Sequence, residues 1–110
     1  GISVANLHLS LGRDDQATQL SAVGEHLPRK SPFLVVGDFN CTNSSTHLEA
    51  FAEANKAQIA NHPQIPTFPS WRPQRDLDHI VYSDLVSLEH RRSLALQLSD
   101  HLPVSAEIRF

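Results

Sequence analysis

The stretch Phe33-Leu-Val-Val-Gly-Asp-Phe-Asn40 decides the fold. Its first four residues form a continuous apolar run after Pro32, which is typical of a central strand covered on both faces. Gly37 permits a sharp exit from that strand. Asp38 and Asn40 follow at i and i+2, so their side chains project to the same side if the chain stays extended. An Asx turn after the strand is the competing interpretation of the same residues.

The apolar periodicity outward from this strand predicts further helices and strands. Leu20, Val23 and Leu27 share one face of a helix, and Thr46 with Glu49 has the spacing of a capping box at the start of another. In chain order we expect a strand over 2–8, a helix over 14–27, the strand from Phe33, a helix over 46–55, a proline-rich loop over 61–75, and strands over 77–82, 86–90, 94–98 and 103–110. This order predicts an α/β fold whose two helices cover one face of a sheet.

Composition limits the function classes. The chain has 110 residues, 40% hydrophobic and 19% charged, which predicts a single globular domain over residues 1–110. The net charge of −3 weakens the case for strong non-specific nucleic-acid binding, and the single cysteine, Cys41, excludes an internal disulfide. No apolar run approaches the ~20 residues that a membrane span needs. The chain opens at Gly1 directly before an apolar strand, so we expect a missing N-terminal portion. The sequence does not decide the localisation.

Acidic, amide and imidazole side chains gather where the expected strands begin or end. Any one of them, taken alone, is more often a cap or turn residue. Together they predict a site, because a sheet fixes the loops that leave its strand ends. The residues are His8, Asp38, Asn40, Asp78 and the adjacent pair Asp100-His101.

The types of these side chains suit phosphate chemistry. Asp38 can take a proton from water or hold a hard cation, and the amide of Asn40 can donate to an anionic oxygen. Asp100 offers a hard oxygen ligand, and a protonated His101 supplies positive charge. Asp78 is the natural partner for that imidazole, because a buried carboxylate fixes its tautomer and raises its pKa.

Five motifs follow one another in a specific order: Ala5-Asn-Leu-His-Leu9, Val36-Gly-Asp-Phe-Asn40, Pro66-Thr-Phe-Pro-Ser70, Leu77-Asp-His-Ile80 and Leu98-Ser-Asp-His-Leu-Pro-Val104. With this order and spacing, the chain resembles the C-terminal half of the endonuclease/exonuclease/phosphatase family, which includes phosphodiesterases like pancreatic deoxyribonuclease and the abasic endonucleases. The resemblance covers nearly the whole chain. It implies half of a four-layer α/β-sandwich, with one mixed sheet of about five to six strands and two helices on one face.

The resemblance also implies a role for each matching residue. Asp38 would orient or deprotonate the attacking water, and Asn40 would help to hold the scissile phosphate. Asp100 would be a ligand of Mg²⁺ or Mn²⁺. His101 would contact the phosphate and stabilise the charge of the transition state, with Asp78 hydrogen-bonded behind it.

One part of the family pattern has no counterpart in this sequence. The family's N-terminal half supplies an early Asn and a Glu that is the principal metal ligand, whereas Glu25, Glu49 and Glu53 lie on expected helices. A lone Asp100 would hold Mg²⁺ poorly. His8 would be a second imidazole on the phosphate, at a position where some family members use another residue.

The implied function is therefore the C-terminal part of a divalent-metal-dependent phosphoesterase that is inactive or weak alone. The alternative is a non-catalytic module that binds a phosphate ligand or a protein. The implied substrate is a phosphate ester in a nucleic acid, a nucleotide or a phospholipid head group. We expect the missing N-terminal half as a partner and, for the chain by itself, a symmetric dimer that buries apolar sheet faces.

Three residues near these motifs have open roles. Trp71 and Arg72 in the proline-rich loop suit stacking on a base or a lipid head group, although Trp71 equally suits covering the edge of the core. His79 follows Asp78 and is a candidate for a phosphate contact. The remaining histidines, His47 among them, are expected at the surface or as caps.

Overall fold

The computed structural model describes residues 1–60 and 63–110, so the first two residues of the expected 61–75 loop lie outside the described residues. The elements are β1 (Ser3–His8), α1 (Arg13–His26), β2 (Phe33–Asp38), α2 (Thr46–Ala54), β3 (Ala57–Ile59), β4 (Asp78–Ser83), β5 (Ser87–Ser93) and β6 (Val104–Arg109). Within the described residues, no helix is long and apolar enough to cross a membrane. The radius of gyration is 13.4 Å, close to the ~13 Å expected for a compact domain of about 100 residues.

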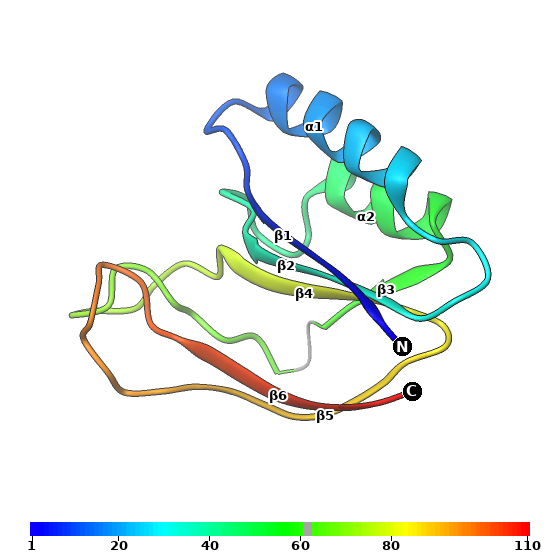
Figure 1. The fold of residues 1–110 in the computed structure, drawn as a ribbon. Helices are drawn as coiled ribbons and strands as arrows, with labels where there is room; N and C mark the ends of the chain where they lie inside the picture. The colour runs from blue at the N-terminus through cyan, green and yellow to red at the C-terminus, as the bar shows by residue number, and fades with distance from the viewer. Residues whose placement is uncertain (61–62) are drawn as a thin grey trace.

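Four strands form a mixed sheet in the spatial order β1-β2-β4-β3. β1 runs parallel to β2, with α1 as the crossover between them, and β4 is antiparallel to both β2 and β3. Figure 1 shows α1 and α2 together on one face of this sheet. The α/β class and the placement of both helices on one face, as predicted from the sequence, are confirmed.

The core lies between this sheet and its two helices. Phe33 and Val35 of β2 point into it and are buried against Leu20 of α1 and against Leu48 and Phe51 of α2. Full burial of an aliphatic or aromatic side chain contributes about 1.5–3 kcal/mol. The apolar stripes predicted for the two helices therefore anchor them to the sheet.

The last two strands leave this sheet and pair with each other. β5 and β6 form an antiparallel sheet of two strands, with a register shift between Glu89 and Arg92. Figure 1 shows it on the side of the larger sheet opposite the helices. The six strands are thus divided four and two, and not joined in the single sheet that we expected. β3, a strand of three residues that the sequence did not reveal, lies beside β4, so both sides of β4 are taken and neither β5 nor β6 pairs with it.

The prediction of a strand over 94–98 is wrong. Leu94 N donates to Pro103 O (2.9 Å) and Leu96 N to Leu94 O (2.8 Å), but the segment joins no ladder with a neighbouring strand. Leu96 and Leu98 are exposed. The alternation of leucines in this segment therefore reflects a loop with apolar side chains on its surface.

Candidate active site

Three strand ends meet at one edge of the larger sheet. The parallel strands β1 and β2 end together with His8 beside Asp38, and the antiparallel β4 begins there with Asp78 opposite Asp38. Figure 1 shows this edge below the loop between β1 and α1. All six candidate residues from the sequence line one open pocket at this edge: His8, Asp38, Asn40, Asp78, Asp100 and His101.

A tight corner follows β2. Gly37 has a φ of +136°, and a Cβ atom built on it would lie 1.9 Å from the carbonyl oxygen of Leu7, so only glycine lets β1 and β2 approach this closely. Asn40 is left-handed, with a φ of +49°, and its backbone N–H donates to Asp38 Oδ1 (2.8 Å). The chain does not stay extended here, because this i to i+2 bond closes an Asx turn. The turn nevertheless leaves both side chains on the pocket.

The side chain of Asn40 is already engaged. Its Nδ2 donates to the carbonyl oxygen of Leu9 (2.5 Å), which ties the corner after β2 to the loop after β1. An amide NH₂ carries two hydrogens. One N–H of Asn40 therefore remains for an anionic oxygen in the pocket.

His101 lies between two carboxylates. Its Nδ1 donates to Asp78 Oδ2 (2.7 Å), and its Nε2 lies 3.4 Å from Asp38 Oδ2. Thr67, which is fully buried, donates its hydroxyl to the same Asp78 oxygen. The ring of Phe68 packs against the imidazole, with the ring centroids 4.9 Å apart. The hydrogen bond to Asp78 and the contact with Phe68 thus fix the orientation of the His101 ring.

The surrounding charges shift the pKa of His101. Burial by itself lowers the pKa, but the hydrogen bond to Asp78 and the negative charges of Asp78, Asp38 and Asp100 outweigh it and hold the pKa above its ordinary value. The side chain exposes only 22% of its surface, so water screens these charges incompletely. His101 is therefore disposed to carry a positive charge that faces Asp38.

The other two candidates lie at the pocket's mouth. His8 exposes 74% of its side chain and places Nε2 at 3.4 Å from Asp38 Oδ2, so both imidazoles face the same carboxylate oxygen. Asp100 is exposed, and its backbone carbonyl accepts the N–H of Ser70 (2.7 Å). Among the described residues, nothing donates a hydrogen bond to the Asp100 side chain.

The chain matches the model of the Endonuclease/Exonuclease/phosphatase family over residues 2–101. The chain belongs to this family. Uncharacterized protein YbhP of Escherichia coli K12 is 34% identical over 117 residues, covering 97% of this chain and 46% of that protein.

Solved structures agree with this family. A mannosyl-6-phosphatase of Bacteroides thetaiotaomicron superimposes with a TM-score of 0.80 at 20% identity, over 96% of this chain and 50% of that one. The catalytic domain of human Nocturnin, solved with a bound sulfate anion, gives a TM-score of 0.60 at 25% identity, over 97% and 46%. This chain therefore spans about half the length of its endonuclease/exonuclease/phosphatase relatives.

Sequence reasoning left several supporting residues of this family member without a role. Thr67, Phe68 and Ser70 come from the proline-rich loop, and Ser70 Oγ donates to the carbonyl oxygen of Ser99 (2.6 Å). The density of prolines signalled a stiff loop, but its contacts depend on the tertiary fold. The sequence left the role of His79 open. In the structure His79 is buried, and its Nε2 donates to the carbonyl oxygen of Cys41 (2.6 Å).

Gln16 is another residue that the sequence did not mark. It exposes 2% of its surface, and its Nε2 lies within hydrogen-bond distance of three carbonyl oxygens: Ser10 (2.8 Å), Leu11 (3.2 Å) and Asn40 (3.1 Å). Its Oε1 accepts from His47 Nε2 (2.6 Å), so His47 is not a plain surface residue. Burial, then the charge of Arg13, lowers the pKa of His47. One amide of α1 thus joins the corner after β2 to the loop after β1.

The oxygen ligands of the pocket fit a divalent cation only in part. Ligand atoms of Asp38, Asp78 and His101 all lie within 4.8 Å of one another. Asp78 Oδ2, however, already accepts from both Thr67 and His101, which occupies its lone pairs. Asp78 Oδ1 and the carboxylates of Asp38 and Asp100 remain for a hard cation, and Mg²⁺ is usually bound by one or two carboxylates together with water and phosphate oxygens.

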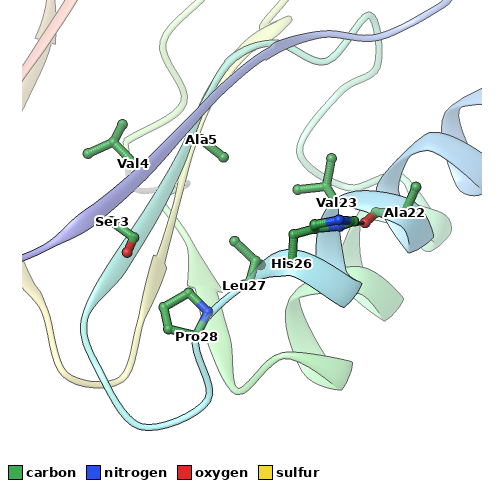
Figure 2. A pocket seen from close by; sticks show the side chains of 8 residues that line it. All are labelled: Ser3, Val4, Ala5, Ala22, Val23, His26, Leu27 and Pro28. Carbon is green, nitrogen blue, oxygen red and sulfur yellow. Dashed lines mark hydrogen bonds between the residues drawn. The ribbon is translucent and has the colours of Figure 1, made fainter.

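A second hollow lies between α1 and the open edge of β1. Figure 2 shows Ala5 of β1 turned toward Val23 and Leu27, while Val4 points to the other side of the strand. His26 is the one titratable residue that lines it, and its Nδ1 is within 3.0 Å of the carbonyl oxygen of Ala22. This hollow therefore lacks the groups that catalysis of phosphate transfer needs.

Proposed function

We propose that the pocket belongs to a divalent-metal-dependent phosphoesterase that cleaves a phosphodiester or phosphomonoester by in-line attack of water. The arrangement of His101 carries the proposal, because its Nδ1 is held by Asp78 and its Nε2 faces Asp38. A fixed, positively charged imidazole beside a carboxylate is suited to bind a phosphate oxygen while the carboxylate orients water.

Each residue has a defined task in this proposal. Asp38 orients the attacking water and accepts its proton, and the Asx turn keeps its Oδ2 turned toward both imidazoles. His101 and His8 donate to phosphate oxygens. The free N–H of Asn40 is a third donor. Asp78 is a positioning residue, because it acts through His101.

The cation would be Mg²⁺ or Mn²⁺, with Asp100 as a ligand. When bound, it supplies positive charge that stabilises the pentacovalent phosphate. Asp100 alone forms a weak site, because Asp38 is engaged with the water and Asp78 with His101, and the family resemblance assigns the principal metal-binding Glu to the N-terminal half of the domain. We therefore expect residues 1–110 alone to hydrolyse phosphate esters slowly or not at all, and to gain activity when that half is supplied as a partner.

The sheet face turned away from the helices supports a second proposal. Val4 on this face is 58% exposed, and β5 and β6 are the only strands that Figure 1 shows on that side in the described part of the chain. We propose that residues 1–110 form a symmetric dimer that buries this face. Sedimentation at micromolar concentration tests it, and a monomeric profile would show that the face tolerates exposure.

Hydrolysis of p-nitrophenyl phosphate and bis(p-nitrophenyl) phosphate with Mg²⁺ or Mn²⁺ tests the catalytic proposal. The assay is run on residues 1–110 and on the chain extended by the N-terminal half of the domain. Asp38→Asn should lower the rate of the extended chain by about 10²–10⁴-fold. Asp84→Asn, at an exposed position beyond the far end of β4, is the matched control. Equal rates for both variants would refute the role of Asp38.

The alternative is a binding module without catalysis. Two observations favour it: the side-chain hydrogen bond of Asn40 to the carbonyl oxygen of Leu9, and the two hydrogen bonds that Asp78 Oδ2 already accepts. Calorimetric titration with inorganic phosphate, with and without Mg²⁺, separates the two functions. Phosphate binding of equal affinity with and without Mg²⁺, in a chain that hydrolyses neither ester, would support the non-catalytic binding module.

A further inference from the structure

We propose that the substrate is a phosphoester in the head group of a lipid, and that the loops around the pocket rest on the bilayer surface. This proposal rests on the phosphoesterase function proposed above, because it takes the pocket as the phosphate site. Two independent features carry it: the absence of basic side chains from the pocket's lining and the exposed apolar side chains on the loops that surround it.

The lining of the pocket suits a single phosphate group better than a chain of phosphates. Within the described residues that line it, none is lysine or arginine, and the side chains there that can accept a proton to become cations are the imidazoles of His8 and His101. Binding of a nucleic acid depends on Lys and Arg that neutralise several successive phosphates. The net charge of −3 adds no attraction for a polyanion. A substrate with a single phosphoester and an uncharged remainder fits this lining better.

Large exposed apolar side chains lie on the loops that surround the pocket. Leu11 lines the pocket from the β1–α1 loop and is 85% exposed. Leu98 is 80% exposed and Trp71 is 67% exposed. The hydrogen bonds of Ser70 to the carbonyl oxygens of Ser99 and Asp100 join the two segments that carry Trp71 and Leu98. Figure 1 shows these two loops beside each other at the end of the molecule where β4 begins.

These side chains have the chemistry of an interfacial contact. Leucine on loop tips buries apolar surface at the boundary of head groups and acyl chains, and tryptophan favours that same boundary. Arg72 directly follows Trp71 and is exposed, and the guanidinium of an exposed arginine can contact lipid phosphates while its stem covers apolar surface. A bilayer that contacts these loops would present its head groups to the pocket between them.

The only tryptophan of the chain lies in this contact, so it reports binding directly. The experiment mixes residues 1–110 with phosphatidylcholine vesicles, which carry no net charge, and follows both Trp71 emission and flotation with the vesicles. We expect a blue shift and co-flotation. Leu98→Ser and Leu11→Ser should each lower the partition coefficient about tenfold or more, the change expected when one leucine leaves an apolar environment.

Leu85→Ser is the matched control, because Leu85 is 55% exposed in the turn after β4, at the other end of that strand from the pocket. The control variant should bind vesicles as the unmodified chain does. An unchanged Trp71 spectrum would overturn the proposal, as would equal weakening by Leu85→Ser. A single-stranded oligonucleotide that shifts the Trp71 emission and displaces the vesicles would overturn it in favour of nucleic acid. The vesicle experiment measures binding, whereas the soluble-ester assay measures catalysis. A chain that binds vesicles but hydrolyses neither ester would therefore refute the catalytic proposal and leave the lipid contact standing.

Discussion

Asp38 and Asp78 are paired across β2 and β4, and the imidazole of His101 lies between their carboxylates. The strand register fixes the two acids, so the position of the imidazole depends on the loop that brings His101 to them. Two separate parts of the chain thus meet in one hydrogen-bonded unit. Its charge state is the first property that experiment can test.

We expect the pKa of His101 to lie above the ordinary histidine value of about 6.5 and to fall in Asp78→Asn, which removes the hydrogen-bonded carboxylate. Because the pKa is raised on folding, the resulting stability is fully present below the unfolded pKa and is lost as the pH rises through the folded one. NMR titration of the ring protons measures the pKa, and urea unfolding on both sides of this range measures the stability. A His101 pKa at or below that of an unfolded peptide would contradict the prediction.

Gly37→Ala should destabilise the protein by at least about 2 kcal/mol, since it combines a strained backbone with a clash against the carbonyl oxygen of Leu7. Gly12→Ala is the control. A Cβ atom at Gly12 would come no closer than 3.8 Å to a neighbouring atom, and the cost at this N-cap should stay within about 1 kcal/mol. Urea denaturation compares the two variants, and similar losses would show that the close approach of β1 and β2 is not limiting.

Gln16→Met keeps the volume of the side chain but removes its donors from three carbonyl oxygens. The expected loss of stability is about 3 kcal/mol, the cost of leaving buried polar groups unpaired. Amide exchange should also accelerate at residues 9–11 and 39–41 more than elsewhere, because Gln16 joins these loops. Gln58→Met, at the exposed middle position of β3, is the control. Uniform acceleration over the whole chain would show a general loss of stability and no local positioning.

Thr67→Val removes the hydroxyl that donates to Asp78 and keeps the shape of the side chain. We expect a loss of about 1–2 kcal/mol, because the partly buried carboxylate oxygen of Asp78 loses one donor. Thr42→Val is the comparison, since its hydroxyl contacts Ser44 in an exposed loop. Thermal unfolding of both variants measures the difference. If both lose the same stability, Thr67 does not support Asp78.

The sequence by itself determined the elements with strong periodicity and the residues at their ends. Phe33 to Val36 predicted the central strand because four consecutive apolar residues need cover on both faces. Both helices followed from their apolar stripes. The six residues of the pocket could be chosen in advance, because strand ends are fixed by local pattern and by motif spacing.

Only the tertiary structure decided how these parts meet, because neighbouring strands and buried polar partners come from distant parts of the chain. β3 could not be predicted, since three residues show no period, and it takes the position beside β4, while β5 and β6 pair with each other in a second sheet. The side chain of Asn40 finds its partner, the carbonyl oxygen of Leu9, only when the fold brings the loop after β1 beside the corner after β2. Thr67 and Gln16 look like ordinary polar residues until the fold buries them, when each must find a hydrogen-bond partner.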